Sequence, residues 1–260
     1  MDEASRRPAK TVRRKLDPVR TRQDILAAAR EEFAERGLNG ARMDAIAART
    51  KTVKHMIYHY FGSKEGLYLA VLEEAYADIR HFEAELKLDQ YPAVEALCRL
   101  IHFTFDYDEA HPDFIRLVST ENMHHAKHMA KSEVIHDLNR SVIAILQRVL
   151  DRGKRDGVFR PDVDPVDIHL LMSSFCFFRV ANRYTFSELF GRDLLDPPLR
   201  LLHRQMLVDS VLNAVMVVRR TVSGASDFYT VKHHLSRFGR FATETPGRLS
   251  RQAPWAAIKL

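Results

Sequence analysis

Apolar residues recur every three or four positions along most of residues 21–219, which is the spacing of amphipathic helices. No segment alternates apolar and polar residues in the way that half-buried strands do. We therefore expect an all-α fold. The predicted helices span about residues 21–37, 43–49, 53–60, 64–86, 93–108, 112–123, 132–155, 165–183 and 197–219, and residues 184–196 are predicted to form a loop with a short turn.

Capping and turn residues indicate where several of these helices begin and end. Thr21 is an acceptable N-cap for the first helix, and Gly37 is predicted to end that helix with a positive φ. Ser63 is predicted to cap the helix over 64–86. Prolines favour the first turn of a helix, and they stand at the predicted starts near Pro112 and Pro197.

The helices predicted over 43–49 and 53–60 are short and are joined by a tight turn. The second of them carries cations and tyrosines close together. This order is typical of a helix-turn-helix, whose second helix lies in the major groove of DNA. The side chains expected to be exposed on that helix are Lys54, His55, Tyr58 and His59.

Residues 21–68 resemble the DNA-binding domain of the tetracycline-repressor-like (TetR) family of bacterial regulators. The matching residues are Ile25 to Ala29, Phe33, Gly37, Ile46 and Ala47, Ile57 to Phe61, and Lys64 to Leu67. Beyond this stretch the chain is similar to the family mainly in its helical architecture. The resemblance implies an N-terminal three-helix helix-turn-helix domain followed by a helical ligand-binding and dimerisation domain.

The resemblance also implies which residues contact DNA. Lys54 and His55 correspond to positions at the start of a recognition helix that meet base edges. Tyr58, His59 and Lys64 resemble family positions that hold phosphates, which fix register while base contacts specify sequence. The full expected DNA-binding set is Arg42, Thr52, Lys54, His55, Tyr58, His59 and Lys64. For Tyr58 the alternative is a place in the core, which we accept for Phe61 and in part for Tyr60.

The turn before the predicted recognition helix departs from the family pattern, which has glycine, an apolar residue and serine there. Here Lys51, Thr52 and Val53 occupy those places. Lys51 is expected to adopt a left-handed conformation, at a cost of roughly 1–2 kcal/mol for a residue with a side chain. Val53 has no side-chain oxygen to cap the helix, whereas Thr52 has one if the boundary shifts by one residue.

Charge is distributed unevenly along the chain. Residues 1–66 hold 15 Lys/Arg against 9 Asp/Glu, residues 67–219 hold 18 against 23, and residues 220–260 hold 7 against 2. Positive charge therefore lies on the segment expected to face phosphate and on the C-terminal tail. We expect a disordered basic arm over 1–20 that contacts DNA, a DNA-binding domain over 21–66, a helical effector-binding and dimerisation domain over 67–222, and a disordered basic tail over 223–260.

Composition excludes several other classes of protein. No apolar run is long enough for a membrane span, and the basic N-terminus is not followed by the apolar region of a signal peptide. Cys98 and Cys176 cannot form a disulfide framework and lack metal-site spacing, so a cytoplasmic location is expected. No phosphate loop, dinucleotide-binding motif or nucleophile elbow is present, so we expect neither an enzyme nor a bound cofactor.

Aromatic residues concentrate in the predicted helices over 93–108, 112–123 and 165–183. Aromatic stripes at helical spacing are usually core, but pockets between helices are also apolar with a few placed polar groups. In the TetR family such helices enclose an effector pocket, and an arginine inside it would favour a carboxylate or another anion. The expected pocket residues are Phe103, Phe114, Glu121, Asn122, His125, Phe175 and Arg179.

His124 and His128 have the i, i+4 spacing of two metal ligands, but surface or pocket polar residues are the favoured interpretation, so no metal site is predicted. We expect a homodimer that forms through the predicted helices over 165–183 and 197–219, and we interpret an apolar face of the last helix as part of its interface. That expected interface comprises Leu207, Val211, Ala214, Val215 and Val218.

Together these patterns favour a homodimeric transcriptional regulator that binds a double-stranded DNA operator and responds to a small molecule, most simply a repressor. An architectural DNA-binding protein without a ligand is the main alternative, because a basic N-terminal domain and tail would serve it equally well. A helical enzyme with an accessory DNA-binding domain is a weaker third reading. The effector, the operator and the regulated genes do not follow from the sequence.

Overall fold

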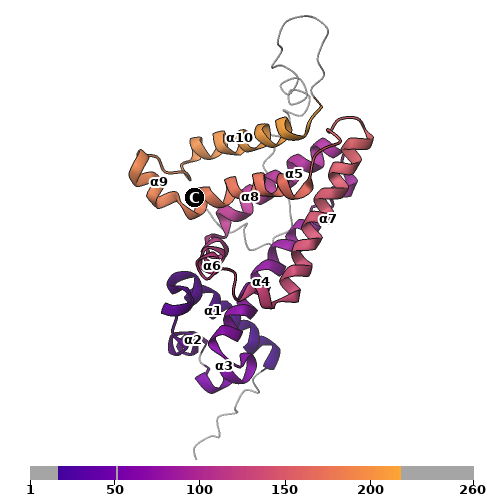
Figure 1. The fold of residues 1–260 in the computed structure, drawn as a ribbon. Helices are drawn as coiled ribbons and strands as arrows, with labels where there is room; N and C mark the ends of the chain where they lie inside the picture. The colour runs from indigo at the N-terminus through magenta and orange to yellow at the C-terminus, as the bar shows by residue number, and fades with distance from the viewer. Residues whose placement is uncertain (1–16, 51, 218–260) are drawn as a thin grey trace, which may run out of the picture. The chain divides into compact units, whose positions relative to one another are not determined.

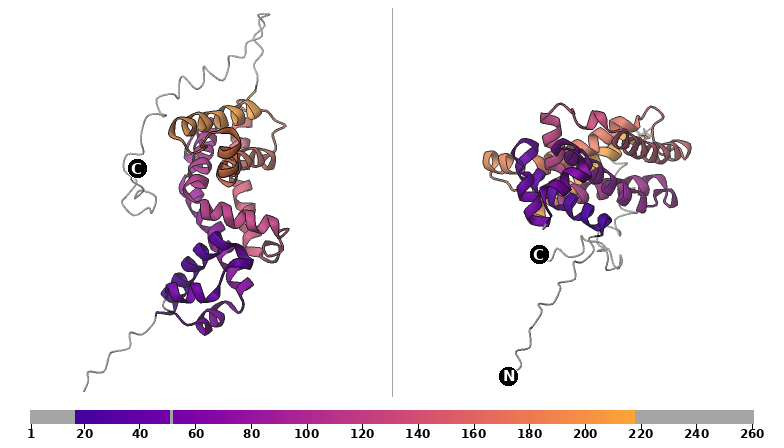
Figure 2. Two further views of the ribbon diagram at one scale, coloured as in Figure 1. Left: turned by 90° about the vertical axis from the view of Figure 1, so that its left-hand side faces the viewer. Right: turned by 90° about the horizontal axis from the view of Figure 1, so that it is seen from below.

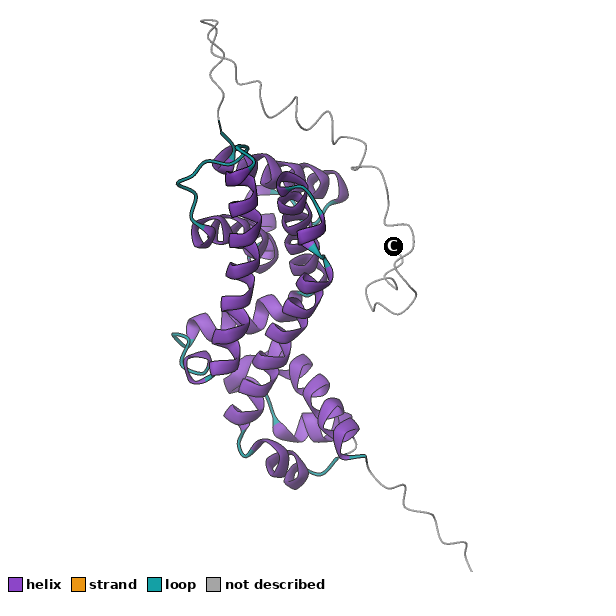
Figure 3. Cartoon of the chain, turned by 90° about the vertical axis from the view of Figure 1, so that its right-hand side faces the viewer, coloured by secondary structure: helices purple, strands orange, loops and turns teal. Residues whose placement is uncertain are grey.

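The structure is a computed structural model that describes residues 17–50 and 52–217. Its described residues form helices joined by short loops, and Figure 3 draws no strand among them, so the all-α prediction is confirmed. The chain divides into two compact units, one ending at Val71 and the other beginning at Leu72. Within the described residues, no helix combines the length and the apolar composition that crossing a bilayer requires.

The first unit contains α1 (Pro18–Gly40), α2 (Met43–Thr50), α3 (Lys54–Phe61) and the first turns of α4 (Lys64–Glu85) (Figure 1). One apolar residue from each helix is fully buried in its core: Ile25, Ile46, Ile57 and Leu67. Phe33 of α1 meets Tyr68 of α4 edge to face, with ring centroids 5.2 Å apart. The helical periodicity of the sequence therefore identified the inward faces of this unit correctly.

The start of α1 differs from the prediction. Asp17 is the N-cap, because its carboxylate accepts hydrogen bonds from the amides of Val19 and Arg20, and Pro18 opens the helix. Thr21 lies one turn inside the helix, where its hydroxyl donates to the Asp17 carbonyl oxygen. Gly37 has φ of 64°, as predicted, but it produces a kink and the helix continues to Gly40.

The second unit contains the rest of α4 together with α5 (Ala93–Ala110), α6 (Pro112–Met123), α7 (Glu133–Arg155), α8 (Pro165–Ala181), α9 (Arg183–Phe190) and α10 (Pro197–Val215), and the 3-10 turns Leu88–Gln90 and Met129–Lys131. Helices α5 and α8 contact each other, and each also contacts α7 and α10 (Figure 1 and Figure 2). The apolar core of this unit lies among these four helices.

Close packing fastens the end of α7 to the end of α10. Gly153 of α7 lies against the ring of Phe159, and a β-carbon on Gly153 would come within 2.0 Å of that ring. The amide of Arg160 donates to the carbonyl of Val215 at 2.8 Å, and the amide of Val217 donates to the carbonyl of Val158 at 3.1 Å. Glycine is therefore required at 153 by packing and not by a special backbone conformation.

The region after α8 also departs from the sequence prediction. Helix α8 ends at Ala181, and residues 183–190 form α9 where a loop was expected. Gly191, with φ of 64°, ends α9. Tyr184, Leu189 and Phe190 remain exposed, so α9 lacks the buried apolar stripe by which sequence periodicity identifies a helix.

Candidate nucleic-acid interface and effector cluster

Helix α3 is anchored by one side and exposed on the other. Ile57 is its fully buried residue, whereas Lys54, His55, Tyr58 and His59 are exposed. The four residues expected to contact DNA from this helix are therefore available to a partner. An α-helix with one exposed polar surface has the dimensions needed to enter the major groove of B-DNA.

The turn before α3 confirms the prediction about Val53. Val53 is the N-cap in an extended conformation and makes no side-chain capping bond. Thr52 does not replace it, since its hydroxyl donates to the carbonyl of Thr50 at 3.3 Å. Lys51, predicted to be left-handed, lies outside the described residues. The amides at the start of α3 are thus not capped by a side chain of this turn.

Lys54 has a partner that the sequence did not predict. Its ammonium nitrogen lies 2.6 Å from a carboxylate oxygen of Asp44 on α2, and both side chains are about half exposed or more. An exposed ion pair of this kind contributes between about 0 and 1 kcal/mol. The pair therefore orients Lys54 without preventing it from moving to a DNA phosphate or base.

The residues between α3 and α4 are held in a defined turn. Gly62 has φ of 73°, and the Ser63 hydroxyl accepts a hydrogen bond from the amide of Gly66, which confirms Ser63 as the cap of α4. Lys64 donates from its ammonium group to the carbonyl of Asn39 at 3.3 Å. Lys64, which is expected to contact a phosphate, therefore lies in the first turn of α4, and its side chain is half-buried.

Glu32 of α1 is a buried residue that sequence analysis missed. Its carboxylate accepts a hydrogen bond from the amide of Arg42 at 3.1 Å and lies 3.5 Å from the guanidinium of Arg49. Arg36 lies 3.4 Å from the same carboxylate. Glu32 therefore fixes the start and the end of α2 on α1, while the side chain of Arg42 remains exposed as expected for a DNA contact.

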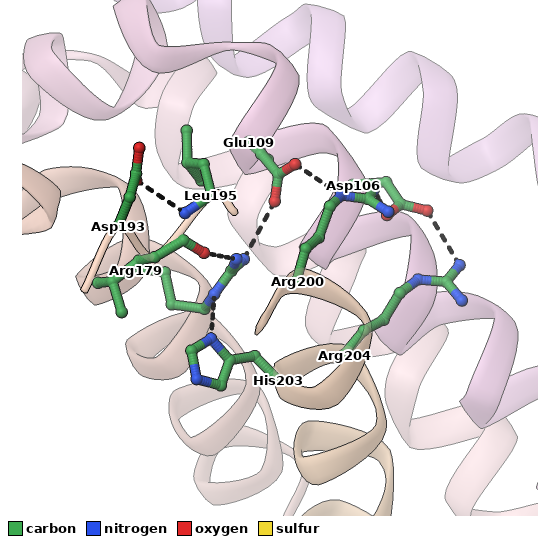
Figure 4. Close-up of polar contacts among 9 residues, drawn as sticks. Asp106, Glu109, Arg179, Asp193, Leu195, Arg200, His203 and Arg204 are labelled. Carbon is green, nitrogen blue, oxygen red and sulfur yellow. Dashed lines mark hydrogen bonds and ion pairs between the residues drawn. The ribbon is translucent and has the colours of Figure 1, made fainter. Parts of the chain in front are cut away.

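Arg179, expected to line an effector pocket, has its guanidinium already occupied (Figure 4). It donates to Glu109 at 3.2 Å, to the carbonyl of Leu194 at 2.6 Å and to Nδ1 of His203 at 3.3 Å. It also stacks over the ring of Phe105, 4.1 Å from the ring centroid. The buried Arg179 therefore joins α5, α8, α10 and the segment before α10, and a ligand anion would have to displace these partners.

Figure 4 shows that this network extends along α10. Arg200 binds Glu109 at 2.6 Å and Asp106 at 2.7 Å, and Arg204 binds Asp106 at 3.0 Å. Burial and the neighbouring Arg179 charge keep the pKa of His203 below its ordinary value. A neutral His203 can accept the hydrogen bond from Arg179 on Nδ1, so the pKa and the geometry agree.

The other residues of the expected pocket do not form one group. Phe103 and Phe114 both pack on Tyr107, with ring centroids 5.5 Å and 6.3 Å from it. Phe175 instead packs against His203, at 6.1 Å. Asn122 and His125 are exposed, so their place in a buried pocket is not supported.

Glu121 is buried, but its carboxylate binds the loop after α6. Its carboxylate accepts hydrogen bonds from the amides of His128 and Met129 and contacts Nδ1 of His128 at 3.0 Å. Burial tends to raise the pKa of Glu121, but these amide hydrogen bonds hold that pKa below its ordinary value.

His124 contacts the carbonyl of Thr120 through Nδ1. Among the described residues, no three His, Cys, Asp or Glu side chains come together in a way that could hold a metal ion.

A second buried polar cluster was also missed by sequence analysis. We call Tyr76, Arg80, Glu83 and Asp108 the Arg80 cluster; all four are buried, three on α4 and one on α5. Nη1 of Arg80 contacts a Glu83 oxygen at 2.5 Å. Burial raises the pKa of Glu83 to about 7, and burial with the Glu83 charge raises the pKa of Asp108 to about 7, against the opposing charge of Arg80.

The expected dimer face of α10 is wrong for its three main residues. Leu207, Val211 and Val215 are buried inside their own chain, in the core shared with α5, α7 and α8. Ala214 is half-buried, and Val218 lies outside the described residues. The sequence identified an apolar stripe correctly but assigned it to the wrong partner, because periodicity does not reveal which surface covers a stripe.

Different apolar residues are exposed on α8 and α10. On α8 these are Val166, Leu170 and Phe178, and on α10 they are Leu201, Leu202 and Met206. The two helices contact each other within the unit. Exposed apolar side chains grouped on neighbouring helices are typical of an interaction surface.

Comparison with known proteins agrees with this architecture. Residues 25–71 match the family described as bacterial regulatory proteins, tetR family, and residues 93–211 match the tetracyclin repressor-like C-terminal domain. The chain is 38% identical over 177 residues to the HTH-type transcriptional repressor NicS of Pseudomonas putida, covering 68% of this chain and 84% of that protein. It is 35% identical to the HTH-type transcriptional repressor SCO4008 of Streptomyces coelicolor, covering 56% and 74%.

A solved structure supports the same assignment. The putative transcriptional regulator SCO4942 from Streptomyces coelicolor matches with a TM-score of 0.57 and 29% identity, over 75% of this chain and 98% of that one. The two family matches together cover more than half of the sequence, and they fall on the helix-turn-helix and on the helical body described above. The chain is therefore a DNA-binding transcriptional regulator that belongs to the TetR family.

Proposed function

We propose that the protein is a homodimeric repressor that binds a two-fold symmetric operator through α3 and leaves it when a small molecule binds the second unit. The observation that carries the first part is the exposed surface of α3. Ile57 and the core beneath it hold the helix in place, while the side chains of Lys54, His55 and Tyr58 are exposed. Arg42, Thr52, His59 and Lys64 supply further contacts around it, chiefly to phosphates.

A second copy of the chain is the proposed occupant of the exposed apolar residues on α8 and α10. Two α3 helices must reach half-sites one helical turn apart, about 34–36 Å, so a helix-turn-helix regulator needs a dimer to read a symmetric operator. Leu170, Phe178, Leu202 and Met206 provide the apolar surface for that contact. The interface would be self-complementary, so a single substitution changes it twice.

Release by a ligand requires unequal affinity for the DNA-bound and free states. Relatives support a repressor, since NicS of Pseudomonas putida and SCO4008 of Streptomyces coelicolor are both HTH-type transcriptional repressors. Helix α4 gives the ligand a route to the DNA-binding unit, because its first turns belong to that unit and its later turns carry Arg80. A coupling of about 1–3 kcal/mol between the sites is sufficient for regulation.

Footprinting on the DNA next to the gene tests this function. We expect a protected site of limited length with two-fold symmetry, and transcription from the adjacent promoter that rises when the gene is deleted. Binding of equal strength along unrelated DNA, with no effect on transcription, would instead support an architectural protein. Lower transcription after deletion would make the protein an activator.

A further inference from the structure

Three buried or half-buried arginines in the second unit have an Nε atom that is shielded from solvent yet makes no hydrogen bond: Arg80, Arg152 and Arg204. Their side chains differ in exposure, at 8% for Arg80, 21% for Arg152 and 27% for Arg204. The Arg152 and Arg204 side chains are thus partly open to solvent, whereas the Arg80 side chain is enclosed by protein. An unsatisfied N–H on a buried cation is costly, and a bound water, ion or ligand is one explanation for such a group in a folded protein.

The surroundings of Arg80 supply proton donors as well as charge. Glu83 pairs with one edge of the guanidinium, and Asp108 lies within electrostatic range of both. Tyr76 of α4 is buried beside them, and its pKa is raised to about 12 by burial, so it remains a neutral phenol. The groups that face the cluster from other helices are Glu121 of α6 and His169 and Cys176 of α8.

Those outlying groups do not compete for protons near neutral pH. Burial and the Arg80 charge lower the pKa of His169, so this imidazole is neutral. Burial raises the pKa of Cys176, so its thiol is not ionised. Glu121 is ionised but is already bound by the amides of His128 and Met129. Glu83 and Asp108 are therefore the groups in the cluster that exchange protons near pH 7.

Aromatic rings border the cluster. Tyr76 packs on Phe114 with centroids 5.3 Å apart, and Tyr107, which precedes Asp108, packs on Phe82, Phe103 and Phe114. Flat apolar surfaces with one unsatisfied cationic donor suit a ligand that has an aromatic body and a single carboxylate.

We propose that Arg80 is the recognition residue of the effector site, that its free Nε edge binds the carboxylate of an aromatic acid, and that binding draws a proton onto the Glu83–Asp108 pair. This deepens the proposed function, on which its regulatory meaning rests. The ligand anion adds one negative charge to a buried site that holds one cation and two carboxyl groups. Uptake of one proton restores the balance, with Glu83 and Asp108 then neutral and Arg80 paired with the ligand.

Proton uptake determines the direction in which the ligand affinity changes with pH. As pH rises through about 7 the pair loses protons that the bound state requires, so the affinity falls, by up to about tenfold per pH unit for each proton taken up. A cationic ligand would show the opposite trend, because it would bind the ionised carboxylates and expel a proton.

Isothermal titration calorimetry on the full chain, between about pH 6 and about pH 8.5, tests this with benzoate, its neutral amide benzamide and the cation benzylamine as probes. We expect benzoate to bind most tightly, with weaker binding at higher pH and proton uptake revealed by buffers of different ionisation enthalpy. Arg80→Gln should abolish benzoate binding, and Arg152→Gln, the matched variant of an arginine with a similarly unpaired Nε, should leave it unchanged.

The double variant Glu83→Gln with Asp108→Asn mimics the protonated pair. It should keep benzoate binding but lose its pH dependence, which a merely structural role would not produce. The proposal is overturned if benzoate does not bind, if benzylamine binds more tightly than benzoate, or if Arg80→Gln binds benzoate like the wild type. Operator affinity without any probe is measured in parallel, so a failure of the DNA-binding function is recognised separately from a failure at Arg80.

Discussion

Arg80 and Arg179 are both buried arginines of the second unit, yet their surroundings differ. Arg179 has hydrogen bonds to Glu109, Leu194 and His203 and a stacked ring, whereas Arg80 pairs with Glu83 and keeps an unbonded Nε. The bonds of Arg179 join helices, whereas the unbonded Nε of the more fully enclosed Arg80 is the donor that we propose for a ligand. Arg152 and Arg204 also have an unbonded Nε but lie on more exposed side chains, so it is burial together with a free donor that sets Arg80 apart.

Replacing Arg179 should have the largest effect on stability. Arg179→Ala removes one partner of a buried ion pair and leaves the Leu194 carbonyl without its donor, so we expect a loss of about 3–5 kcal/mol in the free energy of unfolding. Urea denaturation measures this change. Arg192→Ala is the matched control, since Arg192 is exposed and should change stability by about 0.5 kcal/mol or less. Equal effects of the two variants would contradict a structural role for Arg179.

The Arg80 cluster should make stability depend on pH. Glu83 and Asp108 keep their protons up to about pH 7 in the folded chain but release them near pH 4 when unfolded, so the folded state binds more protons in between. Their contribution to stability therefore falls as pH rises from about 4 to about 7. Glu83→Gln with Asp108→Asn should flatten that fall in thermal denaturation, and a curve parallel to wild type would argue against the raised pKa values.

Replacing Arg80 should cost less stability than replacing Arg179. Arg80→Gln leaves Glu83 able to take up a proton, so we expect a loss of only about 1–3 kcal/mol in the free energy of unfolding. Urea denaturation of both variants in one buffer compares them directly. If Arg80→Gln proved the more destabilising, Arg80 would be a structural residue like Arg179.

The smallest expected effect concerns the ion pair on the DNA-binding surface. Asp44→Ala removes the exposed partner of Lys54, so stability should change by no more than about 0.5 kcal/mol, while DNA affinity should rise slightly because a negative charge is lost near phosphate. Fluorescence anisotropy at fixed salt measures the affinity. Weaker DNA binding by Asp44→Ala would indicate that the pair must remain closed for Lys54 to act.

The helices of the first unit could be predicted because their local signals and their burial agree. The spacing of Ile25, Phe33, Ile46 and Ile57 matches one buried face per helix, and Ser63 caps α4 as its sequence context indicates. The site in the second unit could not be predicted in the same way. On α4, Arg80 and Glu83 have the i, i+3 spacing of an ordinary surface pair, and only tertiary packing buries them with Asp108.

Two predictions from the sequence, the dimer interface on α10 and the loop at α9, are wrong for the same physical reason. The buried stripe of α10 was assigned to a dimer because Leu207 and Val211 are apolar at helical spacing, but α5, α7 and α8 cover that stripe in the same chain. Helix α9 was missed because its apolar residues stay exposed. A sequence shows that a stripe is apolar, while its covering surface depends on contacts between distant segments.

DNA-binding titrations of two α3 variants at fixed salt measure whether α3 reads a specific operator. Lys54→Ala and Tyr58→Phe each remove a group from the exposed side of the helix and leave the buried Ile57 in place. We predict that each weakens binding to the footprinted operator by about 1–3 kcal/mol, with unchanged thermal stability. Wild-type affinity in both variants would contradict the assignment of α3 as the recognition helix.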